Sequence, residues 1–291
     1  MLFRAAPRSP YYLRPQAELR GLVALAADGL SSLDLKRARS LSRLRAGFQL
    51  TDAETSGTGV IFSGDIGILE ASDARFTLEP TVTSYGAYTR RLEELNARWL
   101  QGTAVDWALW CGPPAVDLRY PTEVDGRAVA YLAAHFELQR QVGHCAFLRR
   151  GAGSEWHAER TDVRQVAFDQ IVPVDAIDGS IVWAEISVRE TLAGRLMRTL
   201  FKPAPVRLYV VQKNGATFVQ DVVPAITREG FLLSPLVDSW IPLLKVAGGR
   251  GSQRQVVGVS VGLRPLGFPP EWLYRPEVTI STTILRSSRR D

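Results

Sequence analysis

Long apolar runs are what this sequence most clearly lacks. The best N-terminal stretch, "GLVALAADGL", is interrupted by Asp28. It falls well short of the roughly 20 apolar residues that a membrane-spanning helix needs. It also lacks the order of charged, apolar and small-residue segments that marks a secretory signal. We therefore expect the chain as written to be soluble.

Cysteine and histidine are also scarce. Cys111 and Cys145 are the two cysteines, and neither has a partner at the C-x-x-C spacing of zinc sites. They could face each other as a disulfide or lie as two small buried hydrophobic residues, and the second alternative is favoured. The histidines, His135, His144 and His157, show no metal-ligand spacing such as H-x-x-x-H. No metal and no cofactor is predicted.

The sequence contains no P-loop, no G-x-G-x-x-G fingerprint and no G-x-S-x-G elbow. The glycine-rich stretch "GTGVIFSGDIG" does not lead into an apparent helix, which a phosphate-binding loop requires. The familiar nucleotide-binding and serine-hydrolase motifs are therefore excluded.

Basic residues are plentiful but unevenly placed, and they gather in the first fifty residues. Leu41 and Leu44 recur there at helical spacing, so this segment is predicted to be a basic amphipathic helix. Its basic residues are Lys36, Arg37, Arg39, Arg43 and Arg45. A solvated face is the favoured interpretation, and contact with an anionic membrane surface or acidic partner is the alternative. A nucleic-acid partner is not expected, because the charge is not grouped along the rest of the chain.

Helical and strand patterns alternate in the next hundred residues. A helix is predicted over 88–100 and a second over 122–138, with apolar strands at 105–111 and 144–150. The first helix is expected to bury one stripe of side chains, Tyr88, Leu92, Leu95 and Trp99. This order of elements is typical of βαβ units, so an α/β domain with parallel strands is predicted.

The second half has short β patterns and turn signals but little helical periodicity. We predict an all-β antiparallel sandwich of jelly-roll type, with a hairpin turn at "KNG" and a short interrupting helix near 189–201. Three regions follow from this division of the chain. They are a helical basic lead-in over 1–56, an α/β domain over 57–152 and a β-sandwich domain over 155–291.

The stretch "VDLRYPTEVDG" is the most suggestive polar constellation. Asp117 and Arg119 follow an apolar strand, where α/β sheets place their crevice, and could form bidentate hydrogen bonds to a ligand. The favoured alternative is that they only fix the loop through an ion pair and backbone bonds. Asp117 with Glu123 or Asp125 could supply the two carboxyl groups of a glycosidase.

Tryptophan offers a second set of candidates. Four tryptophans lie in patterned apolar segments and are predicted to be core residues: Trp99, Trp107, Trp110 and Trp183. The other three lie near loops and are candidates for stacking on sugar, although packing is the favoured role. These are Trp156, Trp240 and Trp272.

Several quoted segments together resemble the soluble tail of uncharacterised bacterial multi-pass membrane proteins similar to glycosyltransferases that use lipid-linked sugars. The segments are "TSYGAYTRRLEELNARWL", "DWALW", "DLRYPTEVDGRAVAYL", "CAFLRR" and "DVVPAITREGFLLSPLVDS". In those proteins a tyrosine segment leads into a helix with an asparagine, followed by an Asp-x-Arg loop and a second helix. The residues at these places here are Tyr85, Tyr88, Thr89, Asn96, Asp117, Arg119 and Asp125. The resemblance spans roughly residues 60–240 in separate pieces.

The resemblance implies a non-catalytic, extracytoplasmic accessory module of a cell-envelope glycan or lipid-sugar system. Such a module would bind carbohydrate or a membrane-embedded partner protein, and would be membrane-associated as part of a longer chain. The expected ligand-binding residues are Tyr85, Tyr88, Asp117, Arg119 and Asp125. Because this chain has no membrane helices, transferase activity that resides in a membrane part does not carry over. A glycosidase or sugar transferase, and a purely structural or assembly protein, are the alternatives.

Overall fold

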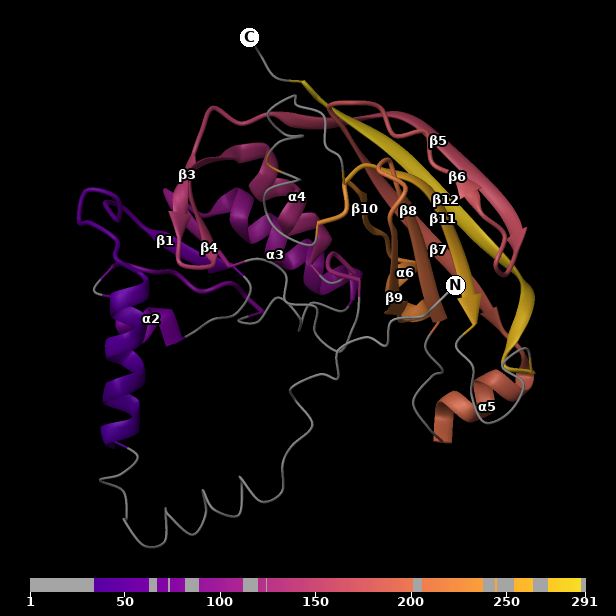
Figure 1. Cartoon of the computed structure of the whole chain (residues 1–291), viewed down its shortest axis with the longest axis horizontal. Coiled ribbons are helices and arrows are strands. Elements are labelled where there is room, and N and C mark those ends of the chain that lie inside the picture. The colour runs from indigo at the N-terminus through magenta and orange to yellow at the C-terminus, as the bar shows by residue number, and fades with distance from the viewer. Residues whose placement is uncertain are drawn as a thin grey trace, which may run out of the picture.

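The computed structural model describes residues 34–62, 67–72, 74–81, 89–111, 120–123, 125–200, 206–237, 244, 254–263 and 272–288. The described elements form successive layers, which Figure 1 shows from left to right. A small sheet comes first, two helices follow, and two larger sheets complete the molecule. Among the described helices, none is both long enough and apolar enough to cross a bilayer.

The small sheet contains four strands in the order β1-β2-β4-β3. Its strands are β1 (Gly59–Phe62), β2 (Trp107–Trp110), β3 (Phe136–Val142) and β4 (Cys145–Arg150). β1 and β2 run parallel, whereas β2 with β4 and β3 with β4 run antiparallel. The predicted α/β domain built from βαβ units with parallel strands is therefore wrong.

A missed strand explains this error. The sequence analysis extended the second helix to residue 138, but α4 (Gly126–His135) ends before Phe136, where β3 begins. Gly143, with φ of 58°, then turns the chain directly into β4. A glycine suits this left-handed turn, and the resulting hairpin reverses β4 relative to β2.

Strand β2 is buried on both faces of the small sheet, since successive residues of a strand point to opposite sides. The edge strand β3, by contrast, is exposed over residues 137–141. Ala108 and Trp110 of β2 face the layer formed by α3 (Arg90–Gly102) and α4. Trp107 and Leu109 face the other way, against α2 (Gly67–Ala71), the lead-in and its neighbours. This two-sided burial accounts for the uninterrupted apolar sequence of β2.

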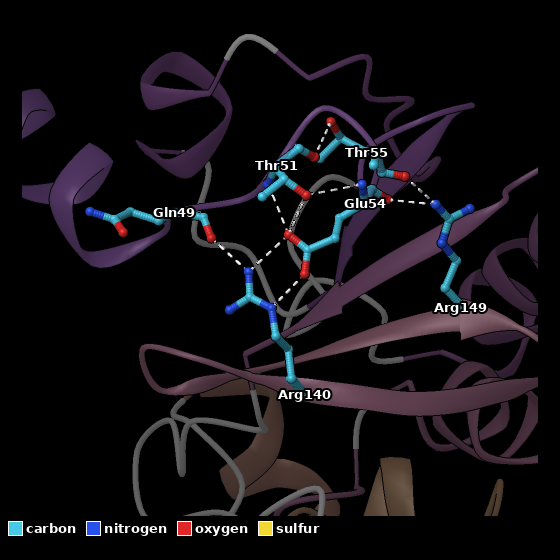
Figure 2. A network of polar contacts seen from close by, with 7 residues as sticks. Gln49, Thr51, Glu54, Thr55, Arg140 and Arg149 are labelled. Atoms are coloured by element: carbon cyan, nitrogen blue, oxygen red, sulfur yellow. Dashed lines mark hydrogen bonds and ion pairs between the residues drawn. The ribbon is translucent and has the colours of Figure 1, made fainter.

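Residues 34–47 of the predicted basic lead-in are helical, and the five basic side chains named above are exposed. A polar network ties the segment that follows to the β3–β4 hairpin (Figure 2). Arg140 donates to the Glu54 carboxylate and to the Gln49 carbonyl, and Arg149 donates to the carbonyl of Ala53. The hydrogen bond from Arg140 lowers the pKa of Glu54 to about 2. The lead-in is therefore attached to the sheet through charged hydrogen bonds.

Cys111 and Cys145 form a disulfide, so the favoured expectation of two buried thiols is wrong. Cys111 directly follows β2 and Cys145 begins β4, and these strands are hydrogen-bonded neighbours. The antiparallel register therefore brings the two residues opposite each other. The predicted parallel arrangement of the strands does not contain this register.

The second half contains eight strands in two antiparallel sheets, ordered β10-β7-β12-β5 and β6-β11-β8-β9. The strands are β5 (Glu155–Ala167), β6 (Val172–Pro173), β7 (Ser180–Glu190), β8 (Val206–Gln212), β9 (Thr217–Val222), β10 (Phe231–Ser234), β11 (Val256–Leu263) and β12 (Tyr274–Ser288). Numbered from β5, the two orders are 6-3-8-1 and 2-7-4-5, which is the strand order of a jelly roll. Ile186, Leu208 and Val259 belong to the core between the sheets.

Two local predictions in this half are confirmed. "KNG" connects β8 to β9, with Gly215 at φ of 80°, and the interrupting helix is α5 (Leu192–Leu200). A second short helix, α6 (Pro224–Thr227), precedes β10.

The helix layer belongs to the cores of both halves. The cluster that holds Val129 and Leu132 of α4 also contains Ile181 of β7 and Leu232 of β10. Apolar packing therefore continues across the junction between the small sheet and the jelly roll.

Candidate functional site

An open groove of about 1010 Å³ lies between the helix layer and the sheet β10-β7-β12-β5. We call it the aromatic groove. Its lining combines aromatic, acidic, basic and amide side chains. The lining residues are Glu94, Ala97, Arg98, Gln101, Arg127, Ala130, Tyr131, Ala134, His135, Ser154, Glu155, Trp156, His157, Trp183, Glu185, Thr283 and Leu285.

One wall of the groove is the outer face of the jelly-roll sheet. Trp183 and Glu185 of β7 reach this face, while Ala184 and Ile186 alternate with them and are buried in the core. Thr283 of β12 lies directly opposite Trp183 in the strand register. The two-residue period of a strand thus places an aromatic ring and a carboxylate side by side on the groove wall.

The ring of Trp183 contacts the guanidinium of Arg127 and packs closely on two glycines. The guanidinium of Arg127 lies 5.1 Å from the centroid of its ring. A Cβ at Gly230 would lie 2.1 Å from the indole Nε1, and one at Gly126 would lie 3.3 Å from the ring. Gly230 also has φ of 95°, which a residue with a side chain rarely adopts. The backbone is therefore built around the indole, which was predicted to be a core residue.

Trp156, which the sequence analysis placed near a loop, lies in β5 and lines the groove. Its indole Nε1 donates to the carbonyl of Ala130 on α4, at 3.1 Å. This bond satisfies the polar edge of the ring and fixes its orientation. Trp272 is exposed elsewhere on the molecule, and Trp240 lies outside the described residues.

Tyr131 and His135 form an aromatic pair on α4, with ring centroids 4.2 Å apart. The Tyr131 hydroxyl accepts from Arg150 at 3.3 Å. Burial, with the charge of Arg150 as a smaller cause, lowers the pKa of His135. The imidazole is therefore neutral near pH 7 and offers one donor and one acceptor.

Acidic and basic side chains both line the groove. Glu94 and Arg98 lie one turn apart on α3, and the bond from Arg90 at 2.8 Å lowers the pKa of Glu94. Glu155 and His157 of β5 approach each other within 3.8 Å. Such a lining has both donors and acceptors, which hydroxyl groups require because each hydroxyl donates and accepts.

The opposite side of α3 borders a second polar region, which we call the sealed cluster. It contains Glu79, Thr81, Glu93, Asn96 and Asp125. Asn96 is its centre, because its Nδ2 donates to Asp125 at 2.9 Å, to Glu79 at 3.4 Å and to Thr81. The Thr81 backbone N–H donates in return to Asn96 Oδ1 at 3.2 Å.

Burial sets the protonation of this cluster. It raises the pKa of Asp125 to about 7, against the opposing hydrogen bond from Asn96. It raises the pKa of Glu93 to about 9, and that of Glu79 well above its usual range, with Asp125 as a second cause in both cases. Glu93 is therefore a neutral acid at pH 7. The charge and the backbone of Arg127 only partly oppose the rise in the pKa of Glu93.

The predicted site residues have different outcomes. Asp125 is fully buried in the sealed cluster, where it precedes α4, and does not line the groove. Glu123 is also fully buried, and its carboxylate accepts from the backbone N–H of Val223. The other predicted ligand-binding residues lie outside the described residues: Tyr85, Tyr88, Asp117 and Arg119. The structure thus shows a contact between Asn96 and Asp125. It does not test contacts of the four residues that lie outside the described ranges.

Sequence reasoning missed most of the groove, including Trp183, Tyr131 and Arg127. A signal for Trp183 was present, because "VWAEIS" alternates apolar residues with Trp183, Glu185 and Ser187. That alternation puts the tryptophan on the polar face of its strand. No comparable signal indicates that α4 and β7 would meet.

Comparisons with protein-family models, curated proteins and solved structures give no significant match to this chain. The candidate site therefore rests on geometry and chemistry alone. The groove has three aromatic side chains, together with hydrogen-bond donors and acceptors. An open groove of this kind can bind a flexible polyhydroxyl ligand. The carboxyl groups whose pKa is raised lie in the sealed cluster instead.

Proposed function

We propose that this protein is a non-catalytic accessory module of a cell-envelope glycan or lipid-sugar system that binds carbohydrate in the aromatic groove. The observation that carries the proposal is the groove lining, where Trp156, Trp183 and Tyr131 stand among carboxylates, guanidinium groups and imidazoles. Aromatic rings bind the apolar faces of sugars, and the charged groups bind their hydroxyls.

Two further features support the proposal. The disulfide Cys111–Cys145 fits an oxidising compartment, as an extracytoplasmic module would meet. The jelly roll is a common architecture of lectin domains, although a fold by itself does not assign a function. We expect a net-neutral, hydroxyl-rich glycan, because acidic and basic groups both line the groove.

The alternatives receive less support. The predicted glycosidase pairs Asp117 with Glu123 or Asp125 across a cleft, and Glu123 and Asp125 are both fully buried away from the groove. A purely structural protein does not need a polar concave site of this size. Binding of a partner protein in the same groove is the alternative favoured if none of the glycans tested below binds.

Binding of neutral, N-acetylated and uronic-acid oligosaccharides to the full chain tests the proposal by calorimetry. Trp156→Ala is expected to weaken glycan binding about tenfold or more, as truncation of an aromatic anchor does. Trp272→Ala is the matched control, because Trp272 is exposed and does not line the groove. Circular dichroism of each variant verifies the fold.

Two results would refute the proposal. One is the failure of the wild-type protein to bind any of the three glycan classes. The other is equal glycan affinity in Trp156→Ala and wild type when both are folded. Glycan hydrolysis during the measurement would instead favour the enzyme alternative.

A further inference from the structure

α5 presents an unusual apolar surface, which we call the leucine ridge. Leu192, Leu196 and Leu200 are 83, 62 and 65% exposed, and Trp272 beside the helix is 64% exposed. The three leucines recur every four residues, so they line one side of the helix. Ordinary surfaces carry scattered apolar residues, whereas a contiguous group indicates a contact.

The opposite side of α5 is fixed to the jelly roll. A Cβ at Gly194 would lie 2.1 Å from the carbonyl oxygen of Leu273, so only a glycine allows this close approach. Thr191 donates through its backbone N–H to the same oxygen at 2.9 Å, and through its hydroxyl to the carbonyl of Trp272. Met197 packs against the jelly-roll core.

Thr191 also caps the helix, since its hydroxyl accepts from the Gly194 backbone N–H at 3.1 Å. This cap and the fixed inner side give the short helix a defined orientation without any help from the leucines. The exposed ridge therefore does not serve the packing of α5. In Figure 1, α5 lies at the edge of the molecule, below the ends of the long strands.

Charge indicates what the ridge contacts. α5 carries Arg195 and Arg198, both exposed, and contains no acidic residue. Arg198 also pairs with Glu190 at 3.6 Å, which partly compensates its charge. A helix with leucines and a neighbouring tryptophan on one side, and Arg195 on its flank, suits the boundary between acyl chains and anionic headgroups.

We propose that the leucine ridge docks this protein on an anionic lipid surface, with Leu192, Leu196, Leu200 and Trp272 entering the headgroup boundary. A second copy of the chain fits less well. A stable protein interface takes about 20 to 30 residues from each side, and the ridge offers four large apolar side chains. The docking surface is independent of the aromatic groove.

Vesicle sedimentation with the full chain tests the proposal. Vesicles made of equal parts phosphatidylcholine and phosphatidylglycerol are expected to bind the wild type, and phosphatidylcholine alone to bind it more weakly. The double change Leu196→Gln and Leu200→Gln keeps good helix formers and is expected to reduce binding about tenfold or more. Arg195→Gln is expected to reduce binding to the mixed vesicles about fivefold.

Val163→Ser is the matched control, because Val163 is a comparably exposed apolar residue on β5, away from α5. Wild-type binding in the double variant would overturn the proposal. So would binding that is lost only when Arg39 and Arg43 become Gln, since that result assigns the contact to the lead-in. Dimers in light scattering that vanish in the double variant, without vesicle binding, would assign the ridge to a second copy and also overturn it.

Discussion

The two sides of α3 place polar groups in opposite physical states. Glu93 and Asn96 face the sealed cluster, where Glu93 is buried and holds its proton near pH 7. Glu94 and Arg98, their neighbours in sequence, face an open groove, where Glu94 holds its charge. One side therefore stabilises the fold through buried hydrogen bonds that Asn96 donates to Asp125 and Glu79. The other side keeps charged groups available to a ligand.

The presence of a polar residue therefore does not by itself identify a binding site. Asp125 looked like a ligand-binding residue in the sequence, but the structure places it in the sealed cluster. Burial converts a carboxylate into a neutral hydrogen-bonding group when no cation compensates its charge. Accessibility to solvent therefore distinguishes the two sides of α3, and four measurements test this distinction.

Asn96→Leu should have the largest effect. It removes the donor that serves Asp125 and Glu79, and leaves buried oxygens without a partner. We expect the free energy of unfolding to fall by about 2–4 kcal/mol in urea denaturation. An unchanged free energy of unfolding would show that the cluster does not support the fold.

Glu93→Gln should change the pH dependence of stability. The pKa of Glu93 is raised from 4.5 to about 9, so the native state holds a proton that the unfolded chain releases above pH 4.5. Wild-type stability therefore declines as pH rises from 4.5 toward 9. The variant lacks this decline and should be more stable at pH 9, by on the order of 1 kcal/mol or more.

Glu94→Gln is the control for that measurement. The pKa of Glu94 is lowered, so its contribution has the opposite sign and is lost as pH falls. Parallel stability curves for wild type and Glu93→Gln between pH 4.5 and 9 would contradict the assignment of a neutral, buried Glu93.

Arg127→Gln probes the residue that acts on both regions. It removes the cation over Trp183, which costs about 0.5–1 kcal/mol of stability at such a site. It also removes the positive charge that opposes the rise in the pKa of Glu93, so that pKa should increase further. Thermal unfolding at several pH values measures both effects, and calorimetry measures the expected loss of glycan affinity.

Arg98→Gln should have the smallest effect on the fold. Arg98 is exposed on the groove side, and its guanidinium donates to the carbonyl of Glu94 at 3.2 Å. We expect a change in unfolding free energy within about 0.5 kcal/mol, and glycan affinity reduced about threefold. A large loss of stability would show that the groove side is also structural.

Much of the local structure could be predicted, because it depends on local chemistry. The β8–β9 hairpin follows from "KNG", whose glycine tolerates positive φ, and α5 follows from its helical spacing. The apolar run of β2 was equally visible. What these patterns lack is information on which elements become neighbours.

The orientation of α3 shows why the rest could not be predicted. Its apolar stripe was expected to be buried, yet Leu95 is 43% exposed and Leu92 and Trp99 are half-buried. The helix buries Glu93 and Asn96 instead, because partners distant in sequence supply hydrogen bonds and a low-dielectric environment. Periodicity measures hydrophobicity and does not register a carboxyl group that becomes neutral on folding.

The same limit applies to the groove. Trp156 could be identified as a candidate from its position near a loop, whereas Tyr131 and Arg127 become groove residues only when α4 lies against β7 and β5. Strand β3 was not predicted either. Without the β3–β4 hairpin, the antiparallel register that pairs the two cysteines could not be predicted.

The continuity of the helix layer with the jelly roll has a practical consequence for dissecting the molecule. Leu132 of α4 and Leu232 of β10 share one apolar cluster, although a hundred residues separate them. A cut near residue 153 would expose, on each fragment, the apolar surface that packs against the other fragment in the intact protein. Recombinant halves would therefore tend to aggregate, whereas co-expressed fragments could recover solubility by reassociating along that seam.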